Sequence, residues 1–239
     1  YLGLSLIYFS YKMYLNTHTY YSLRYGAFSS ETLLQLAQQN GCNTIALTDI
    51  NTTSSCIDFI KESKKYGIKP VIGIDFRNGV KQQFILLAKN NNGFQLMNEF
   101  LTDILHHKKE IPAQAPKIKN TFVIYPFDKN KERKLAKNEY LGIAPKDIPF
   151  IRIKNIKTDQ AVILQTVSFR SKKDFNAHRL LRAIDNNTLL SKLPISEQGK
   201  PEHQMLPVTE LMEIYAEFPE VIVNTKHLLD QCEIEFDCS

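Results

Sequence analysis

The chain has 239 residues, of which 43% are hydrophobic and 23% are charged, and its formal net charge is +5. This composition excludes a disordered chain and suits one large α/β domain, or one domain with a small appendage. A mild basic excess is compatible with a nucleic-acid neighbour but does not identify one. The four cysteines have no CxxC spacing, so they predict a reduced, cytoplasmic protein and not a disulfide framework.

The first twelve residues are apolar and rich in tyrosine, and Met13 follows them. They lack the basic start and the small-residue cleavage site of a secretory signal. They are also shorter than the roughly 20 apolar residues that a membrane span requires. We therefore predict that residues 1–12 are an extension ahead of the natural start at Met13, and we expect no membrane partner.

From Met13 onward, apolar strand-like runs alternate with amphipathic helical segments. The expected strands are 13–16, 42–49, 68–77, 81–90, 121–127, 150–155 and 160–169. The expected helices are 29–41, 52–67, 91–107 and 171–187, with a further helical turn or two in 129–142. Continuous apolar runs in such an alternation indicate parallel strands buried on both faces. About seven β–α units fit a closed barrel at least as well as an open sheet.

The alternation of strand-like and helical segments ends after residue 190. Residues 191–207 are a polar, proline-containing connection, and residues 208–232 predict two short helices separated at Pro219. We therefore expect a barrel over residues 13–190. We expect residues 191–239 to be a linker and helices that lead out to another domain.

Polar residues at the ends of the expected strands are the candidate site, because barrel enzymes hold their chemistry at the C-terminal ends of their strands. These candidates are Asn16, His18, Asp49, Asp75, Thr166 and Ser168. One histidine and two aspartates are a poor set of ligands for a metal, and Ile50, beside Asp49, offers no donor at all. From residue types alone we favour polar side chains that cap strand ends. The GxGxxG, GxxxxGK[ST], GxSxG and HExxH motifs are absent from the sequence.

Three motifs follow one another near the start of the chain: NTHTYYSLRYGA, LTDI and GIKPVIGIDF. In this order they resemble the opening of the polymerase-and-histidinol-phosphatase (PHP) domain of bacterial DNA polymerase III alpha subunits. The later segments LLAKN and DFNAHRLL, and the helices from MLPVTEL onward, are similar to later parts of the same family. The resemblance runs from Met13 to the end of the chain. It implies an α/β fold, a distorted (β/α)7-type PHP barrel with a short C-terminal helical lead-out.

The chain departs from the family motifs at the positions where the family holds its metal ligands. Asn16 and Ile50 replace histidines, and Asp75 replaces a glutamate. Thr166 and Ser168 replace an aspartate and a histidine. The resemblance therefore implies a degenerate PHP site, with no catalytic residue and no cofactor in this segment. The residues of that site are Asn16, His18, Asp49, Ile50, Asp75, Thr166 and Ser168.

The function implied by the resemblance is that of a PHP domain fragment of a DNA polymerase III alpha subunit, in DNA replication or in error-prone synthesis. We expect a catalytically inactive scaffold. Its expected partners are the polymerase body of the same chain, DNA through the parent enzyme, and a separate proofreading exonuclease subunit. Nucleotidyl transfer by the DNA-directed DNA polymerase would belong to carboxylates outside this chain.

Two alternatives stay open at this point. A residual metal-dependent phosphoesterase or 3′–5′ exonuclease would bind one zinc or manganese ion through His18, Asp49 and Asp75. A nucleic-acid-binding module would use the basic runs 129–137 and 168–173. Such runs are more often solvated surface, and no aromatic stacking pattern accompanies them.

Overall fold

The computed structural model describes residues 12–236, so Cys238 and the predicted extension before Lys12 lie outside the described residues. The strands are β1 (Lys12–Tyr14), β2 (Asn16–Thr17), β3 (Thr44–Leu47), β4 (Lys69–Asn78), β5 (Lys81–Ala88), β6 (Thr121–Pro126), β7 (Glu139–Ile143), β8 (Ala161–Ile163) and β9 (Thr166–Val167). The α-helices are α1 (Ser30–Gln39), α2 (Cys56–Ser63), α3 (Asn91–His106), α4 (Ile148–Lys154), α5 (Lys172–Asp185), α6 (Val208–Ile214) and α7 (Pro219–Asp230). The 3-10 helices are η1 (Lys64–Tyr66), η2 (Pro145–Asp147), η3 (Leu190–Lys192) and η4 (Ile195–Glu197).

Seven strands form one sheet in the order β1–β3–β4–β5–β6–β7–β8. Strand β5 is antiparallel to both β4 and β6, whereas the other neighbours are parallel. The expectation of uniformly parallel strands is therefore wrong at β5. The reason is the two-residue turn Gly79–Val80, with glycine at its first position, which leads the chain directly from β4 into β5. Gly79 has a φ of 59°, a conformation that glycine adopts without strain.

A short second pair of strands closes the barrel at one end. Strand β2 continues the path of β1, and β9 continues the path of β8. They pair in parallel, with Asn16 opposite Thr166. The backbone N–H of His18 then donates to the carbonyl of Val167 at 2.8 Å. The two edges of the sheet are thus joined at the C-terminal ends of their strands, and the predicted distorted barrel is confirmed.

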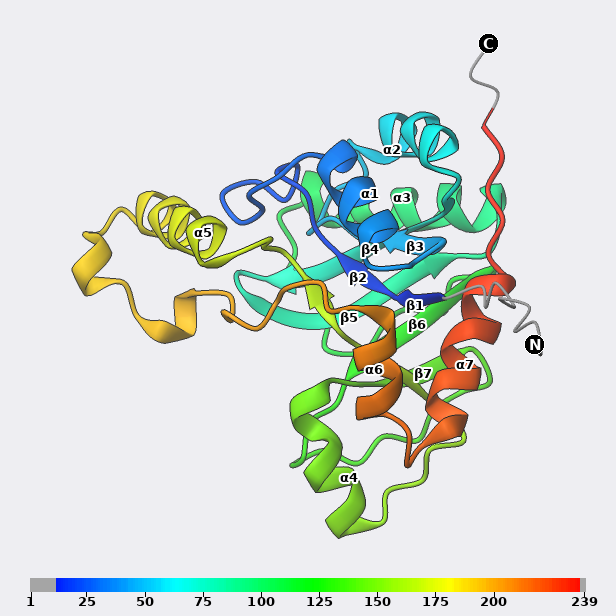
Figure 1. The fold of residues 1–239 in the computed structure, drawn as a ribbon. Helices are drawn as coiled ribbons and strands as arrows, with labels where there is room; N and C mark the ends of the chain where they lie inside the picture. The colour runs from blue at the N-terminus through cyan, green and yellow to red at the C-terminus, as the bar shows by residue number, and fades with distance from the viewer. Residues whose placement is uncertain (1–11, 237–239) are drawn as a thin grey trace, which may run out of the picture.

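Helix α7 covers the gap that remains between β1 and β8 at the other end (Figure 1). The hydroxyl of Thr225 accepts a hydrogen bond from the backbone N–H of Ile163 at 2.8 Å, and the Asn224 amide donates to the carbonyl of Ala161 at 3.0 Å. These side chains pair backbone groups at the edge of β8 that no neighbouring strand pairs. Leu228 and Leu229 are fully buried among the residues of the barrel interior. A helix beyond residue 190 therefore helps to seal the barrel.

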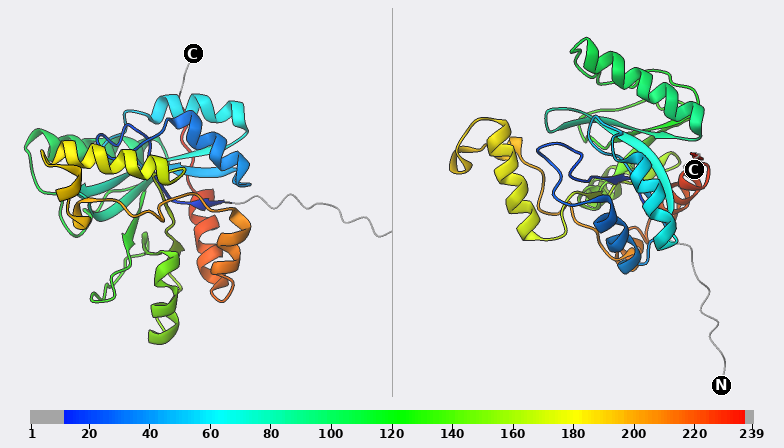
Figure 2. Two further views of the ribbon diagram at one scale, coloured as in Figure 1. Left: turned by 60° about the vertical axis from the view of Figure 1, so that its left-hand side comes forward. Right: turned by 90° about the horizontal axis from the view of Figure 1, so that it is seen from above.

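The remaining helices surround the strands in separate hydrophobic clusters. Helices α1 and α2 share one cluster with β1 and β3, and α3 packs with β4, β5 and β6 in another. Helix α5 and the segment after it extend sideways from the barrel (Figures 1 and 2). Among the described residues, every helix is too short or too polar to span a lipid bilayer.

Two expected elements differ from the structure. Residues 150–155 alternate like a strand but belong to helix α4, because Pro149 at its first turn favours a helix start and Asn155 ends it in the left-handed conformation. Residues 127–138 carry no helix, and β7 begins at Glu139. The two C-terminal helices separate at Pro219 as predicted.

Replacement of Thr225 by Val should lower the free energy of unfolding by about 1–3 kcal/mol, because the buried N–H of Ile163 loses its acceptor while side-chain volume is conserved. Urea denaturation followed by circular dichroism measures this change. Thr225→Ser keeps the hydroxyl and is the matched control. Equal stability of the Val and Ser variants would show that α7 does not seal the barrel through this bond.

Candidate functional site

The predicted site residues come together at the closed end of the barrel. Asn16, His18 and Asp75 are fully buried, and Asp49, Thr166 and Ser168 are at most 8% exposed. Ile50 forms an isolated backbone bridge with Asp75 and therefore lies beside the site. Its apolar side chain has no atom that could bind a metal ion. The pairing of β2 with β9 and of β3 with β4 explains the convergence, because it aligns the C-terminal ends of these strands.

His18 lies between Ser168 and Asp75 and uses both of its ring nitrogens. Its Nδ1 is 2.8 Å from the Ser168 hydroxyl, and its Nε2 is 3.0 Å from Oδ2 of Asp75. Burial lowers the pKa of His18, and this effect exceeds the opposing effect of its hydrogen bond to the Asp75 carboxylate. The neutral ring therefore donates from Nε2 to the carboxylate, and Nδ1 accepts from the serine hydroxyl.

Arg77 is the principal partner of Asp75, and residue types alone did not point to it. Its Nε and Nη2 atoms donate to Oδ2 of Asp75 at 2.9 and 2.7 Å. Gln82, which pairs with Arg77 across the β4–β5 hairpin, donates to the same oxygen at 2.8 Å. The spacing of two residues between Asp75 and Arg77 was a signal for this contact, since such residues tend to share one face of a strand.

The electrostatic balance of this cluster favours an ionised Asp75. Burial raises the pKa of Asp75, but the charge of Arg77 and the hydrogen bonds from His18 and Arg77 outweigh it and hold the pKa well below its ordinary value. Burial acts in the opposite direction on Arg77, yet the adjacent carboxylate keeps its pKa above the ordinary value. The pair is therefore a buried ion pair, with Arg77 only 4% exposed.

Asp49 is directed into the turn after β2. Its Oδ1 accepts from the backbone N–H of Thr19 at 2.6 Å and from the Ser22 hydroxyl at 2.7 Å. Its Oδ2 accepts from the hydroxyls of Thr19 at 2.8 Å and Ser55 at 2.5 Å. Asp49 thus fixes the first β–α turn, and the hydroxyls that surround it were not among the predicted site residues.

Asn16 belongs to a third group of hydrogen bonds, on the strands themselves. Its amide nitrogen donates to the Thr166 hydroxyl at 3.0 Å, and its amide oxygen accepts from the Thr48 hydroxyl at 2.9 Å. These side-chain bonds run from β9 through β2 to the end of β3. The Asn16 side chain thus strengthens the closure of the barrel. Both ends of its amide group are used in these bonds.

The donor atoms that a metal would need are already engaged by protein groups. Both ring nitrogens of His18 and both oxygens of Asp49 have hydrogen-bond partners, and Oδ2 of Asp75 accepts from three residues. Over residues 12–236, no group of three or more His, Cys, Asp or Glu side chains could hold a metal ion. Oδ1 of Asp75 is the one carboxylate oxygen of the cluster without a partner. The residues present therefore do not fit the metal cluster that an intact site of this type implies.

The comparisons with known proteins agree with this architecture. The family model for the PHP domain matches residues 15–140, and the chain belongs to this family. It is 25% identical to DNA polymerase III subunit alpha of Bacillus subtilis, over 93% of this chain and 23% of the relative. It is 26% identical to the corresponding subunit of Mycoplasma genitalium, over 94% of this chain and 27% of that protein. The chain thus spans about a quarter of the length of these relatives.

A solved structure named as a putative metal-dependent phosphoesterase from Bifidobacterium adolescentis is also similar to the chain. The sequence identity is 11%, and the match covers 83% of this chain and 94% of that one with a TM-score of 0.33.

Replacement of Arg77 by Met should lower the free energy of unfolding by about 3–5 kcal/mol, because it leaves the buried Asp75 carboxylate without a counter-charge. Chemical denaturation at pH 7 measures the loss. The matched control is Arg24→Met, which removes an arginine that is 60% exposed from its pair with Asp185 and should cost less than about 1 kcal/mol. Similar losses in both variants would contradict the role of Arg77.

Acidification should destabilise the protein through its buried histidines. His178 Nδ1 donates to the carbonyl of Tyr25 at 2.8 Å, and its Nε2 accepts from the backbone N–H of Gly199 at 2.7 Å. Burial lowers the pKa of His178 to about 4 and exceeds the opposing effect of the Tyr25 bond. The unfolded chain takes up this proton below about pH 6.5, whereas the folded chain does so only near pH 4.

The unfolded state therefore binds more protons in this window, and the free energy of unfolding should fall as the pH is lowered from 7.5 to 5. His178 contributes at most about 1.4 kcal/mol per pH unit. Urea denaturation at several pH values measures the slope, which should be shallower in His178→Gln. An unchanged slope in that variant would contradict the assignment of a neutral His178.

Proposed function

We propose that this chain is a PHP module of a DNA polymerase of the polymerase III alpha type, and that it acts there as a structural scaffold without metal-dependent catalysis. The observation that carries the proposal is the pair of hydrogen bonds that Arg77 donates to Oδ2 of Asp75. The guanidinium group of Arg77 thus neutralises the carboxylate that would otherwise bind a catalytic cation. The PHP family match and the similarity over 93% of the chain to polymerase III alpha subunits support the polymerase context.

In this proposal residues 13–190 form the barrel, and residues 191–239 form the connection and helices that lead toward the polymerase body, although α7 also seals the barrel. The parent enzyme would supply the nucleotidyl transfer and the contacts with DNA, in replication or in error-prone synthesis in the cytoplasm. A separate proofreading exonuclease subunit is the further partner we propose. The reading frame that contains this chain should continue into the polymerase domains of its relatives.

The alternative is a residual metal-dependent phosphoesterase or 3′–5′ exonuclease that binds one zinc or manganese ion through His18, Asp49 and Asp75. The unpartnered Oδ1 of Asp75 is the one feature that favours it. The hydrogen bonds that engage His18 and Asp49 oppose it, because each would have to break before either residue could become a ligand.

Metal analysis of the purified chain should separate the two functions. After incubation with Zn²⁺ or Mn²⁺ and removal of free ions, we expect substoichiometric metal by mass spectrometry. We also expect no hydrolysis of bis(p-nitrophenyl) phosphate or of a single-stranded oligonucleotide above the level of a no-enzyme control. Stoichiometric metal together with hydrolysis that Ser168→Ala leaves intact and His18→Gln removes would overturn the scaffold proposal in favour of the phosphoesterase.

A further inference from the structure

Helix α5 and the segments on either side of it form an arm, residues 170–200, that extends sideways from the barrel (Figures 1 and 2). Helix α7 and the C-terminal end of the described chain lie on the other side of the barrel in these views. The ion pair that carries the proposed scaffold role is buried in the barrel. It therefore does not account for the outer surface of this arm.

Hydrogen bonds and ion pairs hold the arm in one shape. Arg182 donates to the carbonyl of Glu197 at 3.0 Å, which connects α5 to η4. Asp185, at the end of α5, pairs with Arg24 of the first turn at 2.7 Å. The bonds of His178 described above fix the middle of the helix. The outer side chains of the arm are therefore presented by a surface that is already formed.

The outward face of α5 carries an apolar stripe. Ala177, Leu180 and Ile184 follow one another at the three- and four-residue spacing that places side chains on one face of a helix. The buried residues His178 and Arg182 lie on a different face. Such a stripe is typical of a helix face that packs against another element. In the described part of the chain, however, Leu180 is 53% exposed and Ile184 is 60% exposed.

Further aliphatic side chains of the arm are exposed beyond the end of α5. They are Leu189, Leu190 and Ile195, of which Ile195 is 88% exposed. Single exposed aliphatic residues are common on protein surfaces. Five of them within residues 180–195 indicate instead a surface that a partner covers.

The arm also carries most of the net charge of the chain. Residues 170–200 contain seven lysines or arginines and three aspartates or glutamates, so their formal charge is +4, compared with +5 for the whole chain. Each of the three carboxylates pairs with an arginine; they are Asp174, Asp185 and Glu197. Lys172, Lys173 and Lys192 form no ion pair within residues 12–236. The charges that remain available around the stripe are therefore positive.

The combination of apolar and basic groups distinguishes between possible partners. A second copy of the chain would bring two arms of charge +4 together, and like charges across an interface oppose association. A nucleic acid would match the charge, but its phosphate backbone offers no apolar surface for Leu180 and Ile184. A helix with aliphatic residues on one face and carboxylates beside them matches both features.

We propose that the outward face of α5 is a docking site for an amphipathic helix of a separate, acidic protein. Leu180 and Ile184 pack against the aliphatic face of that helix, and Lys172 and Lys173 attract the carboxylates beside it. The arm extends away from α7 and from the C-terminal end of the described chain, which leaves this face open to a separate protein (Figure 2). The site depends on side chains of this chain alone, so it holds or fails independently of the polymerase context.

Fluorescence anisotropy of a labelled synthetic peptide tests the proposal. The peptide has leucines along one helical face and glutamates on the others, and it should bind the purified chain less tightly as the salt concentration rises. Leu180→Ser combined with Ile184→Ser should weaken binding by about tenfold or more, because two aliphatic contacts are lost. Ile153→Ser is the matched control, since Ile153 is 81% exposed on α4, and this variant should bind like the unaltered chain.

Charge reversal tests the basic part of the site. Lys172→Glu combined with Lys173→Glu should weaken binding of the peptide by about threefold or more, because two attractive charges become repulsive. The matched control is Lys64→Glu combined with Lys65→Glu, an adjacent pair of exposed lysines in η1. Circular dichroism of each variant shows whether it is folded.

Four outcomes would overturn the proposal. The first is that the acidic peptide does not bind. The second is that the Leu180/Ile184 variant binds it as tightly as the Ile153→Ser control. The third is that a peptide with lysines in place of the glutamates binds equally well. The fourth is that phosphatidylglycerol vesicles, single-stranded DNA or a second copy of the chain, detected by sedimentation, binds this face while the acidic peptide does not.

Discussion

A carboxylate that is removed from water needs a compensating positive charge, and in this barrel Asp75 obtains it from Arg77. Most of the arrangement around the closed end depends on that pair. Burial, assisted by the charge of Arg77, lowers the pKa of His18, and its ring connects Asp75 to Ser168 at the end of the last strand. Gln82 extends the same cluster across the hairpin to β5. The cluster around this ion pair therefore joins the β4–β5 hairpin to His18 after β2 and to Ser168 after β9.

The closure of the barrel gives this cluster its setting. The sheet edges β1 and β8 meet only where β2 pairs with β9, and the bonds of Asn16 with Thr48 and Thr166 reinforce that point. Helix α7 occupies the opposite end and pairs backbone groups of β8 through its side chains. Asn16 and Thr166, two residues of the candidate site, thus help to keep the barrel closed.

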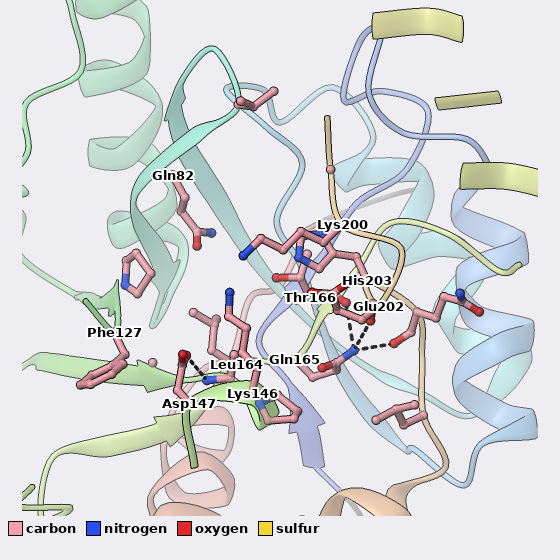
Figure 3. Close-up of a pocket in the computed structure, with 18 of the residues that line it drawn as sticks. Gln82, Phe127, Lys146, Asp147, Leu164, Gln165, Thr166, Lys200, Glu202 and His203 are labelled. Atoms are coloured by element: carbon pink, nitrogen blue, oxygen red, sulfur yellow. Dashed lines mark hydrogen bonds between the residues drawn. The ribbon is translucent and has the colours of Figure 1, made fainter. Parts of the chain in front are cut away.

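The cavity beside this cluster is lined by charged side chains of both signs (Figure 3). They are Arg77, Lys146 and Lys200, together with the carboxylates Asp147 and Glu202. Arg77 is neutralised by Asp75, whereas the two lysines are left facing one another.

The sequence by itself determined the alternation of strands and helices, the break between α6 and α7 at Pro219, and the predicted polar residues that meet at the closed end. It could do so because these features follow from periodicity, proline position and motif order. The antiparallel direction of β5 had a local signal that went unused, the glycine that begins the two-residue Gly79–Val80 turn. Only the tertiary structure decided that α7 seals the barrel, that Gln82 joins Arg77 on Asp75, and that Lys146 faces Lys200. These contacts join separate segments or depend on side-chain directions, which a local pattern of residues does not specify.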